Sequence, residues 1–302
     1  MGFYWSLVIE IWGFMKYIFF GTPEFSAIIL DKLIKADFVP TAVVTNPDRP
    51  AGRGKILTAS AVKTRIMNQE SGIRNTIKIL QPETLDGLFI NELESVGAEA
   101  GVLVAYGKII PKEVINVFPK GIIVIHPSLL PKYRGATPIQ NAILNGDEKT
   151  GTTLFLMDEK IDHGPIIANK KAGIMNDDTY ETLSQKLAGL SGDLLINTLP
   201  EYLEGRVLPK EQNHSQVTYT KKFTSEDGFV DPVDLKEALE KKRPPKAEII
   251  WCKVRALNPE PGVWTIWKGG RRMKILEADL INGNLNLKRV QFDGEKPRLM
   301  AE

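Results

Sequence analysis

Apolar runs and amphipathic stretches alternate along the first two thirds of the chain. Runs rich in β-branched and aromatic residues predict buried strands at residues 16–20, 41–45, 77–80, 100–105, 122–125 and 152–157. Apolar positions at helical spacing predict helices at residues 24–35, 61–70, 83–96, 177–199 and from residue 138 to 144. Strands that alternate with helices predict an α/β fold with a doubly wound, Rossmann-like sheet.

The pattern changes from Thr218 onward. A helix predicted at residues 246–255 precedes short β-like segments at residues 263–267, 273–278 and 285–292, separated by turn signals such as Asn282-Gly-Asn. This pattern is typical of a small β-barrel. We therefore expect four parts: an apolar extension at 1–14, an α/β domain at 15–202, a polar linker at 203–217 and a β domain at 218–302.

Composition and charge narrow the class of protein. With 43% hydrophobic and 25% charged residues, the chain resembles an ordinary soluble globular protein. A single cysteine, Cys252, cannot form an internal disulfide, and no Cys/His cluster predicts a metal site. Residues 1–14 are too short to span a bilayer and lack the basic start of a signal peptide. We expect a cytoplasmic protein without membrane attachment.

Positive charge gathers toward the C-terminus. Residues 215–302 hold 17 Lys and Arg against 13 Asp and Glu, a net charge of +4. Residues 1–214 hold the other 22 against 24, a net charge of −2. The C-terminal part is therefore the expected surface for a polyanion.

Candidate chemistry follows the predicted strands. His126 directly follows the apolar run 122–125, and ligands of open α/β sheets collect at the carboxyl ends of strands. A histidine there suits proton transfer or the stabilisation of an oxyanion, although a histidine held by hydrogen bonds in the core would give the same pattern. No GxGxxG or GxxxxGK[ST] motif is present, which argues against a nicotinamide enzyme or a nucleoside triphosphatase.

The segment from Asn46 to Lys55 has two prolines, two glycines and three basic residues. This composition predicts an exposed loop. Its glycines and positive charge suit a loop that approaches a phosphate backbone, whereas a solvated connector is the alternative.

Five sequence blocks resemble those of the methionyl-tRNA formyltransferases. They are FGTPEF at 20–25, PDRPAGRGK at 47–55, VAYGKIIP at 104–111, HPSLLPKYRGATPIQ at 126–140, and YTKK at 219–222 with RALNPEPG at 255–262. The resemblance implies a formyltransferase domain followed by an OB-like barrel. It also implies an enzyme that moves a formyl group from 10-formyltetrahydrofolate to the amino group of methionyl initiator tRNA.

The resemblance also implies the catalytic residues. His126 takes the place of the family histidine and Asp162, in Ile-Asp-His-Gly, the place of the family aspartate. The family asparagine two residues before the histidine is replaced by Val124, which offers no hydrogen-bond donor. Loss of one oxyanion donor in other enzymes costs about 100 to 1000-fold in rate. We expect a reduced rate with substrate binding retained.

Binding residues are carried over in the same way. The resemblance implies that the folate lies against Tyr106, Gly107, Ile109, Ser128, Leu129, Leu130 and Pro131. It implies tRNA contacts by Arg53, inserted at the acceptor end, and by Arg49 and Lys55. Basic residues expected to follow the tRNA backbone are Lys221, Lys222, Arg271, Arg272 and Lys274. His163 and His214 receive no role.

Two other functions remain open at this point. A formyltransferase for a small amine, such as an amino sugar or glycinamide ribonucleotide, would share the central blocks but not the basic loop or the C-terminal blocks. A catalytically impaired tRNA-binding protein is suggested by Val124 alone. We expect a monomer that needs no metal.

Overall fold

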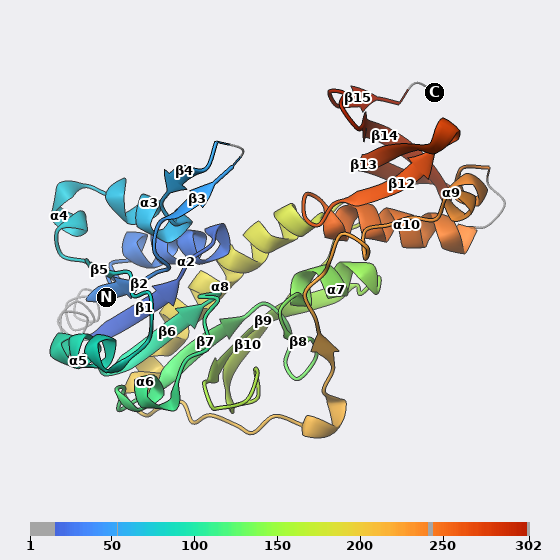
Figure 1. The fold of residues 1–302 in the computed structure, drawn as a ribbon. Coiled ribbons are helices and arrows are strands. Elements are labelled where there is room, and N and C mark those ends of the chain that lie inside the picture. The colour runs from blue at the N-terminus through green and yellow to red at the C-terminus, as the bar shows by residue number, and fades with distance from the viewer. Residues whose placement is uncertain (1–15, 53, 241–243, 301–302) are drawn as a thin grey trace, which may run out of the picture. The chain divides into compact units, whose positions relative to one another are not determined.

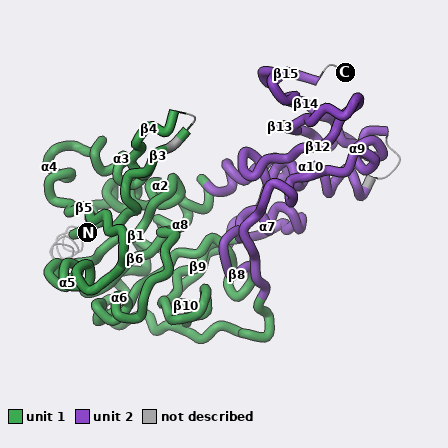
Figure 2. The backbone as a smooth tube through the Cα atoms, viewed as in Figure 1, with its two compact units in different colours: residues 1–132, 151–170, 185–217 green, residues 133–150, 171–184, 218–302 purple. Residues whose placement is uncertain are grey.

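The computed structural model describes residues 16–52, 54–240 and 244–300 (Figure 1). The expected extension at residues 1–14 lies outside these ranges. The chain forms two compact units, each built from several segments (Figure 2). Unit 1 comprises residues 1–132, 151–170 and 185–217, and unit 2 comprises residues 133–150, 171–184 and 218–302. The predicted division of the chain at 202 and 218 stays a prediction.

A seven-stranded sheet forms the centre of unit 1. Its strands, in spatial order, are β10 (Ile166–Gly173), β9 (Lys149–Leu156), β7 (Ile122–His126), β6 (Ala100–Val104), β1 (Tyr17–Gly21), β2 (Ala42–Val44) and β5 (Lys78–Leu80). The pairs from β7 to β5 are parallel, and β9 runs antiparallel to β7. The chain leaves the central strand β1 toward one edge and returns on its other side at β6, which is the doubly wound topology.

Two apolar clusters lie on the two faces of this sheet. One contains buried residues of α2 (Glu24–Lys35), α3 (Ala61–Met67) and α8 (Tyr180–Leu203). The other contains residues of α5 (Gly87–Val96) and α6 (Lys112–Asn116). The sheet is therefore buried on both faces, which explains why its strands are nearly continuous apolar runs.

Local signals explain where the elements of unit 1 differ from the prediction. The helix expected from residue 83 begins at Gly87 because the Asp86 carboxylate caps it, accepting hydrogen bonds from the amides of Leu88 and Phe89. The helix expected at 61–70 ends at Met67, and a separate short helix α4 (Ser71–Arg74) follows it. The loop expected at 46–55 contains strand β3 (Arg49–Ala51), which pairs with β4 (Ile56–Thr58) in a hairpin.

Unit 2 has an antiparallel sheet in the order β12 (Val263–Trp267), β13 (Arg271–Ile281), β14 (Asn284–Phe292) and β15 (Arg298–Leu299). Helices α9 (Pro232–Leu239) and α10 (Pro244–Leu257) pack on it. Helix α7 (Pro138–Leu144) packs on α10, and β8 (Arg134–Gly135) pairs with β11 (Tyr219–Thr220). Single 3₁₀ turns occupy His214–Gln216 in unit 1 and Lys268–Gly270 in unit 2.

These elements confirm the fold class, an α/β doubly wound domain followed by a smaller OB-like β domain. Among the described residues, no helix combines the length and the apolar character needed to cross a bilayer.

Candidate active site

His126 and Asp162, which lie 36 positions apart in sequence, meet at the carboxyl end of β7. His126 is the last residue of the strand and only 5% exposed. Its Nδ1 lies 3.5 Å from Oδ2 of Asp162. This distance is longer than a strong hydrogen bond but within the range of an ion pair. The fold therefore brings a half-buried carboxylate and a buried imidazole together at the end of this strand.

The Asp162 loop follows β9 and owes its shape to two residues. Asp162 has a left-handed backbone with φ of 46°, an uncommon conformation for a residue with a side chain. A Cβ on Gly164 would lie 1.9 Å from the carbonyl oxygen of Leu156, so only glycine fits there. The backbone therefore requires Gly164, and it holds Asp162 in a conformation that few residues with a side chain adopt.

Val124 lies on the same face of β7 as His126, because side chains alternate along a strand. It is 5% exposed and pairs with Leu103 on β6 and Phe155 on β9. All three belong to the apolar cluster that α5 and α6 cover. The position that the family resemblance assigns to an amide is therefore part of the hydrocarbon core.

The loop after His126 is fixed by side-chain hydrogen bonds. The Ser128 hydroxyl donates to the carbonyl of Lys132 at 2.6 Å. Thr153 on β9 accepts from the Leu130 amide at 3.2 Å and donates to the Ser128 carbonyl at 2.7 Å. Ser128 and Leu130 are buried, whereas Leu129 and Pro131 are half-buried. The loop is thus held rigidly beside the histidine.

Tyr106 lies beyond the end of β6, in the same apolar cluster as Val124. Its ring packs edge-on against Phe20 at 5.8 Å between ring centroids. The hydroxyl is buried and has no hydrogen-bond partner among the described residues, and burial raises the pKa of Tyr106 to about 12. A protonated, unpaired donor is therefore available in the core near the strand ends.

The next residues of the Tyr106 segment are open to solvent. Gly107 has a φ of 86°, and Ile109 is 93% exposed. The backbone oxygen of Tyr106 accepts hydrogen bonds from the side chains of Thr22 and Asn46, which follow β1 and β2. These bonds tie together the carboxyl ends of three neighbouring strands, where ligands of doubly wound sheets bind.

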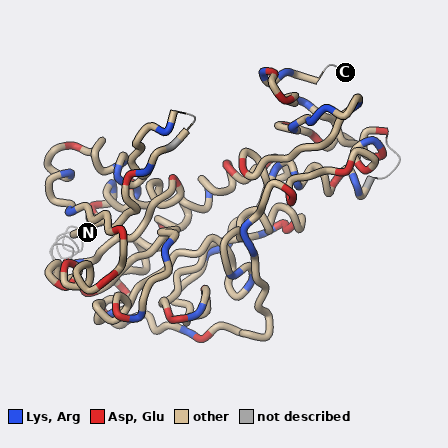
Figure 3. The backbone as a smooth tube through the Cα atoms, in the orientation of Figure 1, with Lys and Arg blue, Asp and Glu red and all other residues tan. Residues whose placement is uncertain are grey.

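The basic residues predicted to contact tRNA differ in how firmly the protein already holds them. In unit 1, Arg49 pairs with Glu83, Lys55 is exposed, and Arg53 lies outside the described residues. In unit 2, Lys221, Lys222 and Lys274 are exposed. Arg271 pairs with Glu295 and lies over the ring of Phe292, and the Arg272 guanidinium lies 4.1 Å from the ring centroid of Trp264. Figure 3 shows Lys and Arg on the β3–β4 hairpin and on the C-terminal strands.

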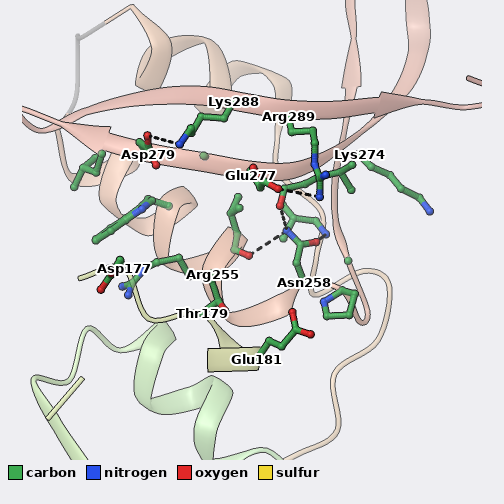
Figure 4. Close-up of a pocket in the computed structure, with 18 of the residues that line it drawn as sticks. Asp177, Thr179, Glu181, Arg255, Asn258, Lys274, Glu277, Asp279, Lys288 and Arg289 are labelled. Carbon is green, nitrogen blue, oxygen red and sulfur yellow. Dashed lines mark hydrogen bonds and ion pairs between the residues drawn. The ribbon is translucent and has the colours of Figure 1, made fainter. Parts of the chain in front are cut away.

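A cavity of about 680 Å³ lies within unit 2, between residues 176–181, α10 and the strands β13 and β14 (Figure 4). Four acidic and four basic side chains line it, and Glu277 pairs with Arg289 at 2.8 Å. Its formal charge is therefore balanced, and a phosphate gains no net attraction there. The sequence analysis missed this cavity because its wall combines residues about 100 positions apart.

Within the described part of the chain, no three His, Cys, Asp or Glu side chains form a group that could hold a metal ion.

Comparison with known proteins identifies the family. Residues 15–199 match the formyl transferase family and residues 245–296 match the formyl transferase C-terminal domain. The methionyl-tRNA formyltransferase of Dictyoglomus turgidum is 42% identical over 267 residues, covering 88% of this chain and 79% of the relative.

Solved structures agree on the fold. The methionyl-tRNA formyltransferase from Clostridium thermocellum gives a TM-score of 0.57 at 21% identity, with 92% of this chain and 98% of the other covered. WlaRD, a sugar 3N-formyl transferase solved in the presence of dTDP and 5-N-formyl-THF, gives a TM-score of 0.59 at 21% identity, with 89% and 87% covered. The chain belongs to the methionyl-tRNA formyltransferase family.

Proposed function

We propose that the chain transfers a formyl group from 10-formyltetrahydrofolate to the α-amino group of methionyl initiator tRNA. The observation that carries this proposal is the pairing of the buried His126 with Asp162, in a chain that is 42% identical to a methionyl-tRNA formyltransferase. The amino sugar and glycinamide ribonucleotide alternatives are not favoured by these relatives. A cytoplasmic location and a monomeric state stay predictions.

The two side chains have complementary parts in this reaction. The amine attacks the formyl carbon, a new C–N bond forms, and the formyl oxygen takes up negative charge. His126 donates a hydrogen bond to that oxygen. The attacking nitrogen becomes positively charged, and Asp162 accepts a proton from it, directly or through water. This proton passes to N10 of tetrahydrofolate as the old bond between N10 and the formyl carbon breaks. No metal is needed for this balance.

The folate is proposed to lie along the strand ends between Tyr106 and the loop 128–131. The apolar side chains of Leu129, Leu130 and Pro131 suit the flat face of a pteridine. The related sugar formyltransferase WlaRD was solved with a formylated folate, which supports the same donor class here.

Transfer RNA is proposed to bind through the basic loop of unit 1 and the exposed lysines of unit 2. Arg49, Arg53 and Lys55 belong to the first group, and Lys221 and Lys222 to the second. Contacts of this kind position a phosphate backbone without reading its sequence. The packed guanidinium of Arg272 contributes less than the two lysines, because Trp264 already holds it.

One assay tests the function directly. The purified chain is mixed with 10-formyltetrahydrofolate and charged initiator tRNA, and formyl-methionyl-tRNA is measured over time. Parallel reactions replace the tRNA with an amino sugar nucleotide or with glycinamide ribonucleotide. We expect formyl-methionyl-tRNA and no turnover of the small amines. Transfer to small amines only, or tRNA binding without turnover, would contradict the proposal.

A further inference from the structure

The segment after α8 runs back along the loop that carries Asp162. The amide of Ile166 donates to the carbonyl of Lys210 at 2.7 Å, and the amide of Lys210 donates to the carbonyl of Ile166 at 2.8 Å. This pair of bonds brings residues 210–214 against residues 162–166. The sequence composition had predicted only a polar linker here.

Gln212 contacts the Asp162 loop through its side chain. Its side chain is buried, and Nε2 donates to the carbonyl of Asp162 at 3.0 Å and to the carbonyl of Gly164 at 2.8 Å. One amide group therefore holds the backbone on both sides of His163. The left-handed conformation at Asp162 is unfavourable for a residue with a side chain, so contacts from outside the loop help to maintain it.

The same loop is also restrained through the side chain of His163. The rings of His163 and His214 stack with 4.4 Å between centroids and 6° between planes. His163 Nδ1 lies 2.6 Å from Oδ2 of Asp158. These contacts restrain the side chain of His163, whereas Gln212 binds the backbone carbonyls of Asp162 and Gly164.

We propose that Gln212 is a positioning residue, which holds the Asp162 carboxylate at the distance from His126 that formyl transfer requires. The inference deepens the proposed function and rests on it for the kinetic part of its test. Three observations support it. The Gln212 side chain is buried, and its amide donates to the carbonyls on both sides of His163. The backbone at Asp162 has an uncommon conformation.

The first test replaces the donor without changing the size of the side chain. Gln212→Glu removes the amide and places a carboxylate against two carbonyl oxygens, while Gln212→Met removes it without adding charge. We expect kcat to fall by about 100-fold in Gln212→Glu and about 10-fold in Gln212→Met, as for a misplaced catalytic group. KM for folate and for tRNA stays within about twofold, because binding contacts are kept.

The matched control is Gln216→Glu, which makes the same charge change at an exposed position of the same segment. We expect wild-type kcat for this control. Wild-type kcat in both Gln212 variants, or a rise in KM that accounts for the whole loss, would overturn the proposal.

A double-mutant cycle separates positioning from general stability. If Gln212 acts through Asp162, then Gln212→Met adds no further loss of kcat to Asp162→Asn. Independent losses that multiply would assign Gln212 a purely structural role and overturn the inference.

A readout without catalysis keeps the inference separate from the proposed function. The chain has three histidines, so the ring ¹⁵N resonances of His126 can be assigned by substitution of the other two. We expect Gln212→Met to change the His126 resonances in the same sense as Asp162→Asn, and Gln216→Glu to leave them unchanged. Unchanged His126 resonances in Gln212→Met would refute the inference, whether or not the wild-type chain forms formyl-methionyl-tRNA.

Discussion

Val124 is held in place by its neighbours on both sides. Strand β7 pairs with β6 on one side and with β9 on the other, so Leu103, Val124 and Phe155 form a row of apolar side chains across the sheet. An amide at this position loses part of that packing but stands two residues from His126 on the same face. Stability and catalysis therefore make opposite demands on one side chain.

Val124→Asn should expose this conflict. We expect kcat to rise by up to about 100-fold, because the amide supplies an oxyanion donor. We also expect a loss of about 1 to 3 kcal/mol in the free energy of unfolding, because a polar amide replaces the two buried methyl groups of valine. Single-turnover formylation and thermal unfolding measure the two effects. A variant no faster than the wild type would show that the missing donor does not limit the rate.

The resemblance to the family motifs predicted His126 and Asp162, and the structure places Nδ1 of the first 3.5 Å from Oδ2 of the second. Their catalytic roles stay predictions. Gln212 could not be found in the same way, because a glutamine in a polar segment has no periodic or charge signal. Its partners are backbone carbonyls about 50 residues earlier, and only the folded chain brings them together.

Elements with strong local signals were predicted well. The strands β1, β6 and β7 are continuous apolar runs, and the structure has each of them within one or two residues of the prediction. The hairpin β3–β4 was missed because its strands are three residues long and contain proline and polar residues. Helices α6 and α9 were missed because five and eight residues give little periodicity.

Helix α10 carries a buried arginine that joins it to the segment before α8. Arg255 is 8% exposed, donates from Nη1 to the Asp178 carbonyl at 3.0 Å and lies 3.9 Å over the ring of Trp251. A helix was predicted at residues 246–255, but the hydrogen bond from Arg255 to Asp178 was not, because it joins positions 77 residues apart.

Arg255→Met should destabilise unit 2. The substitution leaves the Asp178 carbonyl buried without this donor and removes the contact with Trp251. We expect a loss of about 1 to 3 kcal/mol in the free energy of unfolding, measured by chemical denaturation. The control Lys236→Met, at an exposed position of α9, should change stability by less than about 0.5 kcal/mol. Equal effects of the two substitutions would mean that Arg255 is not a structural link.

Charge is a property of the whole molecule, and its uneven distribution favours a polyanion at the C-terminal part. The net charge is +2, divided into −2 for residues 1–214 and +4 for residues 215–302. Ion pairs hold Arg271, Lys288 and Arg289. The Lys221 side chain is 83% exposed, and its Nζ lies 3.9 Å from Oδ1 of Asp227, at the outer limit of an ion pair. Exposed lysines are therefore expected to carry most of the salt-dependent binding.

The affinity for initiator tRNA should fall as salt rises, because each neutralised phosphate releases a counterion. We expect Lys221→Ala with Lys222→Ala to lower the slope of log Kd against log salt by about 2 in magnitude. Lys35→Ala, which removes an exposed lysine of α2, serves as the control. A slope that is the same in the double variant and the control would exclude these lysines from the tRNA surface.

Unit 2 is built from segments that are far apart in the sequence, so its parts are synthesised at different times. Helix α7 ends at Leu144, but its partner α10 begins at Pro244, roughly 100 residues later. At about 5 to 20 residues per second, a ribosome needs about 5 to 20 s to make that stretch. During this time α7 has been translated while its partner α10 has not. The apolar side chains of α7 therefore stay without their final partner for about 5 to 20 s of synthesis.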